Sequence, residues 1–156
     1  MRLARTGVPR REQSAAPTLV GYTAGVFDML HIGHLNLFRA ASQRCGLLIA
    51  GVTTDELALE QRGERPVIPL LERMALVQHV RYVDHVVPQS SVDKVEAWEV
   101  LRFDVLFAGD NLRGTPRWLA VEQDMAEVGV RVVYLPATHV RSGGLLSRGL
   151  SDLVAY

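Results

Sequence analysis

Two histidines three residues apart are the part of this sequence best suited to chemistry. His31 and His34 stand on either side of Gly33, at the end of the segment Gly-Val-Phe-Asp-Met-Leu-His-Ile-Gly-His. At the start of a helix, residues with this spacing share a face, and the glycine lets an anion approach the backbone closely. Free amide groups and the positive end of the helix dipole favour such an anion. The two imidazoles can then donate hydrogen bonds to a phosphate whose charge grows in a transition state.

Paired histidines can also be ordinary surface or core residues, or two ligands of a metal ion. A zinc site needs three or four cysteine, histidine or carboxylate ligands. Cys45 is the only cysteine, and no cluster of cysteine and histidine at suitable spacing completes the set. The grouping of glycine, aspartate and both histidines in one segment favours the phosphate site.

The elements that must position these histidines are predicted to be alternating strands and helices. Buried apolar runs predict strands at 19–24, 47–52, 85–87, 105–108 and 130–135. Amphipathic patterns predict helices at 33–44, 70–80 and 92–101, a short helix after the capping sequence 53–56, another at Thr115 and Pro116, and a last one at Ser142. This alternation predicts a single three-layer Rossmann-like α/β domain with a parallel sheet of about five strands. Ligands bind such sheets where strand carboxyl ends meet helix N-termini.

The composition bounds the molecule to one domain with no bulk attraction to polyanions. The chain has 156 residues and a formal net charge of zero, and Lys94 is its only lysine among 17 basic residues. Arginine must therefore supply nearly every cationic contact to phosphate. We expect a disordered tail at 1–17 and a domain at 18–156. With no apolar run near 20 residues and no secretory h-region, we expect a cytoplasmic protein with neither nucleic acid nor membrane as partner.

The segment at 25–34 resembles the signature of the cytidylyltransferase family, in the nucleotidylyltransferase superfamily with the HxGH motif. Its bacterial glycerol-3-phosphate cytidylyltransferase branch is the most similar. Further segments match that family in order over about residues 19–150: Thr54-Asp55-Glu56, Glu72-Arg73, Arg81-Tyr82-Val83-Asp84, Gly109-Asp110 and Val132-Val133-Tyr134-Leu135-Pro136.

The resemblance implies transfer of CMP from CTP to a small phosphorylated or phosphonate acceptor, with Mg²⁺ accompanying the triphosphate and a homodimer as the assembly. It implies His31 and His34 as catalytic residues, with metal ligands left unassigned. It implies a nucleotide-binding set: Gly25, Val26, Phe27, Asp28, Gly33, Arg62, Asp110, Thr138, Arg141 and Ser142. It implies an acceptor-binding set: Asp55, Arg73, Arg81 and Asp84.

Each residue of the acceptor set also has a structural interpretation. Arg73 and Arg81 can be cations at helix ends, Asp55 a favourable first-turn charge, and Asp84 the cap of a turn. Trp98 and Trp118 stand at helical spacing and are interpreted as core residues rather than ligand contacts.

Three departures from the family pattern bear on the substrate. Arginines, Arg62 or Arg65, replace the lysines of the loop before the middle helix. Asn111-Leu112 replaces an acidic residue and tryptophan after Gly109-Asp110. Ala137 replaces the arginine of the late motif, and Arg141 is the candidate substitute.

These departures keep alternatives open. One is an adenylyltransferase acting on a sugar phosphate or pantetheine phosphate, and another is a non-catalytic nucleotide sensor on the same fold. An aminoacyl-tRNA synthetase is rejected, because the chain has no lysine-rich partner loop, no room for a tRNA-binding domain and no excess of basic charge.

Overall fold

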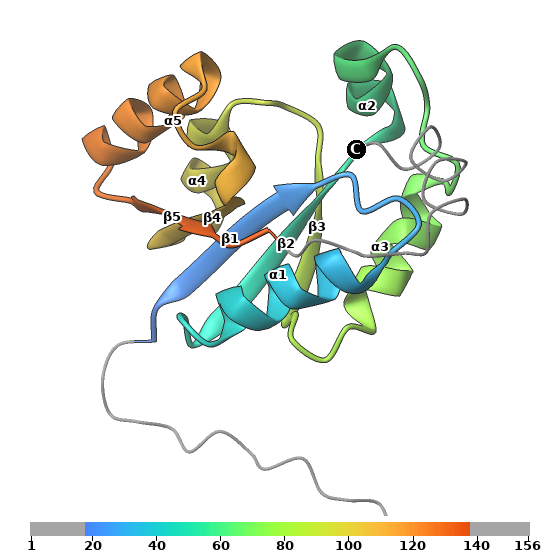
Figure 1. Cartoon of the computed structure of the whole chain (residues 1–156), viewed down its shortest axis with the longest axis horizontal. Coiled ribbons are helices and arrows are strands. Elements are labelled where there is room, and N and C mark those ends of the chain that lie inside the picture. Colours follow the sequence, from blue (N-terminus) through green and yellow to red (C-terminus); the bar gives the residue numbers. More distant parts are fainter. Residues whose placement is uncertain (1–17, 138–156) are drawn as a thin grey trace, which may run out of the picture.

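A five-stranded parallel sheet is the centre of the molecule, seen in a computed structural model that describes residues 18–137 (Figure 1). The strands are β1 (Val20–Gly25), β2 (Leu47–Thr53), β3 (His85–Gln89), β4 (Val105–Gly109) and β5 (Arg131–Leu135). Their order across the sheet is β3-β2-β1-β4-β5, with every pair parallel. The chain therefore steps outward from β1 twice, crosses back over it, and steps outward on the other side. The predicted single α/β domain with about five parallel strands is confirmed.

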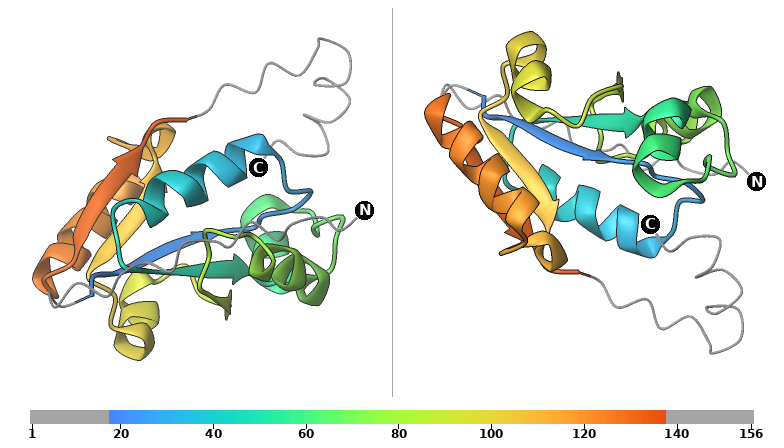
Figure 2. Two further views of the ribbon diagram at one scale, coloured as in Figure 1. Left: turned by 90° about the horizontal axis from the view of Figure 1, so that it is seen from below. Right: turned by 90° about the horizontal axis from the view of Figure 1, so that it is seen from above.

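The helices cover both faces of this sheet. They are α1 (Ile32–Ser42), α2 (Asp55–Arg62), α3 (Leu70–Gln78), α4 (Lys94–Leu101) and α5 (Pro116–Glu127), with a short 3-10 turn, η1, at Asp110–Leu112. Right-handed crossovers place helices on opposite faces when the direction of strand addition reverses. Accordingly α1 and α3 pack on one face and α4 and α5 on the other; Figure 2 shows α1 and α4 on opposite sides.

Each face has its own hydrophobic core. On β2, Leu48, Ala50 and Val52 pack with residues of α1 and α3, whereas Ile49 packs with the α4 and α5 side. This alternation is the period of two that a strand buried on both faces requires. Trp98 and Trp118 pack against the second core, as predicted.

The amino ends of the two central strands are each held by an aspartate. Asp84 Oδ2 accepts a hydrogen bond from the Leu48 amide at 2.7 Å, and Asp104 Oδ2 accepts one from the Val20 amide at 2.8 Å. Both carboxylates thus satisfy donors that begin a strand.

One detail differs from the sequence-based expectation, and two expectations are not tested. Thr115 occupies the N-cap position of α5 with Pro116 after it, but its hydroxyl donates to the Leu112 carbonyl at 2.8 Å and does not cap the helix. The helix predicted from Ser142 and the tail predicted at 1–17 lie outside the described residues. Within residues 18–137 no helix is long and apolar enough to span a membrane.

Candidate active site

The two histidines lie at the first turn of α1, where the carboxyl end of β1 meets a helix N-terminus. His31 is the N-cap, and its Nδ1 accepts from the Gly33 amide at 3.0 Å. Nδ1 of His34 accepts from the His31 amide at 3.3 Å, which completes a reciprocal capping box built from two imidazoles. Because both Nδ1 atoms accept, each neutral ring carries its proton on Nε2. That proton is the donor that each ring can offer to an anion.

The two rings are held together and uncharged. Their centroids are 3.9 Å apart in a stacked arrangement with an interplanar angle of 25°. Burial lowers the pKa of His34 to about 4, with a further lowering by His31 and an opposing effect of Asp28. Burial also lowers the pKa of His31. At neutral pH the pair consists of two neutral hydrogen-bond donors rather than two cations.

The Phe27 ring packs against His34 and fixes its orientation. Phe27 is buried, has a left-handed backbone with φ of 50°, and presents its ring edge-on to His34 at a centroid distance of 5.6 Å. The ring also packs against Phe38 of α1 at 4.8 Å. A Cβ at Gly25 would stand 3.0 Å from the Phe27 ring, so the glycine makes room for it. Gly25 and Phe27 of the motif therefore determine the packing around His34.

Asp28 ties the histidine segment to the loop that follows α2. Its two carboxylate oxygens accept hydrogen bonds from consecutive amides, Val67 at 2.7 Å and Ile68 at 3.0 Å. The side chain is buried. Asp28 was predicted to order this loop, and the two hydrogen bonds show that contact. Its predicted contact with the triphosphate or with magnesium stays a prediction.

Arg73 is the point where three segments of the site meet. Its side chain is fully buried, and its Nε donates to the Ile68 carbonyl at 2.7 Å. Nη1 donates to the carbonyls of Val26 and Thr53, each at 2.7 Å. Nη2 donates to Asp55 Oδ1 at 2.5 Å in an ion pair whose arginine is buried and whose aspartate side chain is 24% exposed. The guanidinium joins the end of β2, the segment after β1 and the loop before α3. Arg73 and Asp55 were also predicted to contact the acceptor, and that contact stays a prediction.

Arg62 lies beside this network at the end of α2. Gly63 follows it as a left-handed C-cap with φ of 78°. Arg62 lines a small cavity together with Asp28, Arg65 and Val67. Arg65 pairs with Glu56 across 3.7 Å on the surface. The arginine predicted to contact phosphate is therefore close to the loop that Asp28 holds.

Asp110 lies at the same edge of the sheet, on the far side of β1. It follows β4, and its Oδ1 accepts a hydrogen bond from the Ala137 amide at 3.1 Å. This contact joins the chain after β4 to the chain after β5. Thr138, Arg141 and Ser142, the rest of the predicted late motif, lie outside the described residues.

Among the described residues, neither Arg81 nor Asp84 makes a hydrogen bond or an ion pair with His31 or His34. The Asp84 carboxylate is bound to the amino end of β2, the edge of the sheet opposite His31. Arg81 is exposed and lines a hollow between α1 and α3 with Ile32, Leu35 and Leu76. The structural interpretation of Asp84 was the cap of a turn, but its observed partner is the amide of Leu48 at the start of β2.

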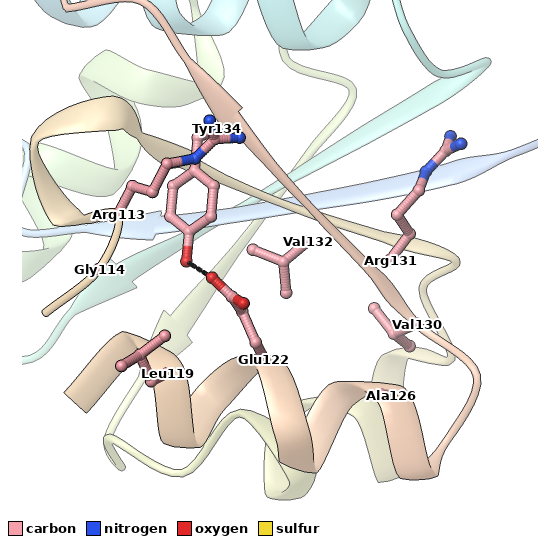
Figure 3. Close-up of a pocket in the computed structure, with 9 residues that line it drawn as sticks. All are labelled: Arg113, Gly114, Leu119, Glu122, Ala126, Val130, Arg131, Val132 and Tyr134. Carbon is pink, nitrogen blue, oxygen red and sulfur yellow. Dashed lines mark hydrogen bonds between the residues drawn. The ribbon is translucent and has the colours of Figure 1, made fainter. Parts of the chain in front are cut away.

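A separate hollow runs between α5 and the edge strand β5 (Figure 3). There the Tyr134 hydroxyl donates to Glu122 at 2.5 Å, and the Arg113 guanidinium lies 4.9 Å from the Tyr134 ring centroid. Burial and the Glu122 hydrogen bond raise the pKa of Tyr134 to about 12. None of the predicted site residues lines this hollow. We therefore place the candidate active site at the start of α1.

Within residues 18–137, no group of three histidine, cysteine, aspartate or glutamate side chains is arranged to hold a metal ion. Magnesium in nucleotide sites is commonly held by substrate phosphates and water with only one or two carboxylates. The carboxylates present at this edge, Asp28 and Asp110, fit that sparse kind of ligation, and a cage of protein ligands is not required.

The fold and the site define a class of protein: a parallel α/β domain with two neutral imidazoles at the first turn of the helix that follows β1. The chain belongs to the cytidylyltransferase-like family, whose sequence model matches residues 22–141.

Curated relatives agree with this family. The chain is 32% identical over 118 residues to the glycerol-3-phosphate cytidylyltransferase of Bacillus subtilis, covering 74% of this chain and 84% of that protein. It is 31% identical over 113 residues to the FAD synthase of Pyrococcus abyssi, covering 72% and 76%. It is 36% identical over 115 residues to the bifunctional protein HldE of Gluconacetobacter diazotrophicus, covering 73% of this chain. The chain spans only 23% of that HldE protein's length.

A solved structure supports the fold. The lipopolysaccharide core biosynthesis protein from Thermoplasma volcanium GSS1 superposes with a TM-score of 0.65 at 20% identity, covering 78% of this chain and 97% of that one.

Proposed function

We propose that the chain is an enzyme that transfers CMP from CTP to a small phosphorylated acceptor and releases pyrophosphate. The observation that carries the proposal is the neutral histidine pair at the N-terminus of α1, with both Nδ1 atoms bound to backbone amides. This geometry leaves two Nε2 donors beside a helix N-terminus, an arrangement suited to charge that develops on phosphate oxygens.

In the proposed reaction, an oxygen of the acceptor's phosphate attacks the α-phosphorus of CTP. A new phosphorus–oxygen bond forms there, the bond to the bridging oxygen breaks, and its electron pair leaves with pyrophosphate. No side chain has to remove a proton, because the attacking phosphate is already anionic at neutral pH. His31 and His34 donate hydrogen bonds to the α-phosphate and to the departing oxygen. Mg²⁺ bound with the triphosphate supplies further charge neutralisation.

The contacts of Asp28 and Arg73 support a rigid setting for this step. They fix the segment after β1 to the loop before α3 through five hydrogen bonds to backbone groups. Positioning is the second source of catalysis when little covalent chemistry falls to the protein. We propose that Arg62, at the end of α2 beside this loop, contacts a ligand phosphate where the family has lysines.

The acceptor proposed first is a glycerol-3-phosphate-like polyol phosphate, or a phosphonate. The likeness to the Bacillus subtilis enzyme over most of its length supports it. A second candidate is adenylyl transfer, which is favoured by the changed late motif at Ala137 and by the comparable likeness to a FAD synthase. A nucleotide sensor without catalysis is the third, and it has no need of both histidines.

The test is a pyrophosphate-release screen of four nucleoside triphosphates against polyol phosphates, sugar phosphates, pantetheine phosphate and phosphonates. We expect release with CTP and a polyol phosphate or phosphonate. Release with ATP alone would move the protein to the adenylyltransferase branch. Binding of CTP by calorimetry without release from any acceptor would support a sensor and contradict the proposed reaction.

We also propose a homodimer. Its support is the hollow between α1 and α3, where the apolar side chains Ile32 and Leu76 are 50% and 47% exposed. Light scattering coupled to gel filtration tests this, and a monomer at micromolar concentration would contradict it. We also propose a cytoplasmic location.

A further inference from the structure

A cavity of about 430 Å³ lies between the edge strand β3 and helix α4, on the face of the sheet opposite α1. Its volume is in the range of small-molecule sites. Two buried polar side chains line it: Tyr22 of β1, which is 1% exposed, and Gln89, the last residue of β3, which is 8% exposed. In small-molecule sites a few such polar groups set the orientation and identity of the ligand. None of the predicted site residues lines this cavity, so it is a separate candidate site.

The Tyr22 hydroxyl reaches Gln89 by crossing the strand that lies between them. Tyr22 Oη donates to Gln89 Oε1 at 3.2 Å, with β2 between β1 and β3. A Cβ at Gly51 of β2 would overlap the hydroxyl, so the glycine keeps this path open. Gln89 Nε2 donates to the Ser91 carbonyl at 2.9 Å, and since a carbonyl only accepts, this contact fixes the orientation of the carboxamide. Residues on three strands are thus matched to place two polar groups at the cavity.

The groups that line the cavity suit hydroxyls better than phosphate. Burial raises the pKa of Tyr22, so its hydroxyl stays neutral and can still accept a hydrogen bond. Ser91 takes one of the two hydrogens on Gln89 Nε2, and the second can be given to a ligand. Val87 and Leu101 add apolar surface, and no lysine, arginine or histidine of residues 18–137 lines the cavity. A ligand with adjacent hydroxyls on a carbon chain or ring matches both kinds of surface.

Two carboxylates at the cavity, those of Asp93 and Glu96, are the groups that would attract an amine instead. Both residues are exposed, and Asp93 Oδ1 already accepts the Val95 amide at 2.8 Å. Exposed charges are screened by water and salt, whereas the buried polar groups of the cavity are neutral. The lining therefore favours a hydroxylated ligand over a cationic one.

The cavity reaches the carboxyl edge of the sheet, where ligands of parallel α/β sheets bind. Gln89 ends β3, and its carbonyl accepts from the amide of Thr54, the N-cap of α2, at 2.9 Å. The segments after β2 and β3 are therefore joined, and His31 follows β1, the strand next to β2 (Figure 1). Neighbouring strands lie about 4.8 Å apart, so the ends of β1 and β3 are separated by about 10 Å. A phosphorylated polyol or sugar can span this distance with its phosphate at the histidines.

We propose that the cavity between β3 and α4 binds the hydroxylated part, a polyol chain or a sugar ring, of the phosphorylated acceptor. This inference rests on the proposed function and narrows its acceptor. The volume of about 430 Å³ corresponds to roughly 14 water molecules at about 30 Å³ each, which is more than a glycerol moiety fills. The acceptor is therefore longer than glycerol phosphate, and Tyr22 and Gln89 determine its specificity.

The experiment follows the amide resonances of the full isotope-labelled chain by nuclear magnetic resonance during titrations. Ribitol 5-phosphate and mannose 6-phosphate are the long probes, glycerol 3-phosphate is the short one, and inorganic phosphate is the probe without a carbon chain. We expect all four to shift the Gly33 amide, and only the long probes to shift the Gln89 side-chain amide and the Ser91 amide. The long probe that binds more tightly distinguishes a chain from a ring.

Three outcomes would contradict parts of the proposal. Absence of shifts at Gln89 and Ser91 with both long probes overturns the site. Larger shifts there with phosphoethanolamine than with either long probe overturn its assignment to hydroxyl groups. Shifts at the cavity in a chain that releases pyrophosphate with no substrate pair would overturn the proposed function and leave the site standing.

Tyr22→Phe removes the hydroxyl and keeps the ring, which stacks on Phe103 at a centroid distance of 4.8 Å. We expect it to weaken binding of the long probes about two- to tenfold, since one neutral hydrogen bond is lost, and to leave glycerol 3-phosphate unchanged. The matched control is Tyr134→Phe, which removes a hydroxyl bound to Glu122 at the other edge of the sheet. Equal affinities of the wild type and Tyr22→Phe, or an equal loss in the control, overturn the role of Tyr22.

Ala97→Leu tests the cavity without removing any of its hydrogen bonds. Ala97 lines the cavity from α4, and a larger side chain there takes the space of the ligand. We expect the affinity for the long probes to fall at least about tenfold, and the KM for a long acceptor to rise while the KM for CTP stays within about twofold. Unchanged binding of the long probes in Ala97→Leu overturns the site, even if Tyr22→Phe does not fold.

Discussion

Two regions at the carboxyl edge of the sheet differ in how their charged groups are satisfied. Around the start of α1, protein groups satisfy the charged side chains. Both oxygens of the Asp28 carboxylate accept hydrogen bonds, and the Arg73 guanidinium donates to a backbone carbonyl and to Asp55. At the start of α4 and α5, Lys94 and Arg117 have no such partners among residues 18–137, and their charged groups meet solvent, since no buried side-chain nitrogen or oxygen of these residues lacks a partner. Protein groups satisfy the charges of the first region, whereas water satisfies those of the second.

The difference separates positioning from binding. Groups that hold a catalytic geometry work best when their own hydrogen bonds are satisfied, because nothing then has to reorganise during the reaction. Groups that recognise a charged substrate must instead keep their charge available. The comparison predicts that substitutions in the first region lower stability or kcat, and that replacing the exposed Arg117 in the second leaves stability nearly unchanged.

Removing the Arg73 side chain should have the largest effect on this comparison. Arg73→Ala leaves three backbone carbonyls and Asp55 without their donor, and breaking a buried charge pair destabilises by about 3–5 kcal/mol. Arg73→Lys should recover only part of the loss, because an ammonium cannot reproduce the planar fork. Urea unfolding followed by circular dichroism measures both.

The matched control for Arg73 is Arg65→Ala. Arg65 and Glu56 pair across 3.7 Å with side chains 57% and 73% exposed, so less than about 1 kcal/mol should be lost. Equal stabilities for Arg73→Ala and Arg65→Ala would contradict the distinction between a satisfied core network and surface charge.

The histidines should give the next largest effect, and it should fall on rate. His31→Ala or His34→Ala removes one donor to the developing charge, and such losses lower kcat by about 10²- to 10³-fold. Steady-state pyrophosphate release gives kcat, and the melting temperature shows whether the fold survives. Turnover near that of the wild type in both variants would remove the histidines from the mechanism.

The fold and the catalytic pair could be predicted because both depend on local pattern. Apolar runs indicated all five strands, and the position of His31 before an amphipathic stretch indicated the first turn of α1. The order of the strands was not predicted, since it depends on which face each crossover covers. The capping roles of the two Nδ1 atoms depend on the side-chain geometry of that turn.

The Arg73 and Asp28 networks could not be predicted, because all but one of their contacts join residues that are 18 to 47 positions apart in the chain. Lys94 was recognised as the only lysine, yet the burial of its side chain was not predicted. That burial depends on how α4 packs in the fold, which the sequence pattern does not contain. The helix predicted at 92–101 begins two residues too early, since α4 begins at Lys94 with Asp93 as its cap.

Arg62 should show an intermediate effect that tells which of the two regions it resembles. We expect Arg62→Ala to lower kcat/KM about tenfold to hundredfold through loss of a charge-assisted phosphate contact, and Arg141→Ala to do the same. A change in KM alone would mean uniform binding, and an equal fall in kcat and kcat/KM a transition-state contact. Arg62→Lys should be milder than Arg62→Ala if charge alone matters. If both alanine variants keep kcat/KM within about twofold, backbone amides and histidines hold the phosphates instead.

A smaller effect is expected from pH. The pKa of His34 is about 4 in the folded protein, lowered mainly by burial from an ordinary value of 6.5. Between pH 6.5 and pH 4, the imidazole of His34 is protonated in the unfolded chain but neutral in the folded protein. The free energy of unfolding therefore decreases as pH falls from about 6.5 toward 4. The decrease is on the order of 1–3 kcal/mol, since one pKa unit corresponds to about 1.4 kcal/mol. His34→Gln should flatten this part of the curve in urea unfolding at several pH values, and an unchanged slope would contradict the buried neutral state.

The smallest effect should come from removing residues 1–17, because both regions of the comparison are built from residues after them. The sequence of this segment shows no apolar periodicity, and Glu12 is its one acidic residue among several arginines. A chain that starts at Thr18 keeps the contacts that begin the sheet: the Leu19 carbonyl still accepts from the Gly46 and Leu47 amides, at 2.8 and 3.2 Å. We therefore expect the melting temperature, the kcat and the phosphate affinity of the shortened chain to match those of the full chain. A selective loss of phosphate affinity would mean that the arginines of 1–17 contribute to substrate binding. A loss of stability would mean that the segment packs on the domain, and either result would extend the comparison beyond the first strand.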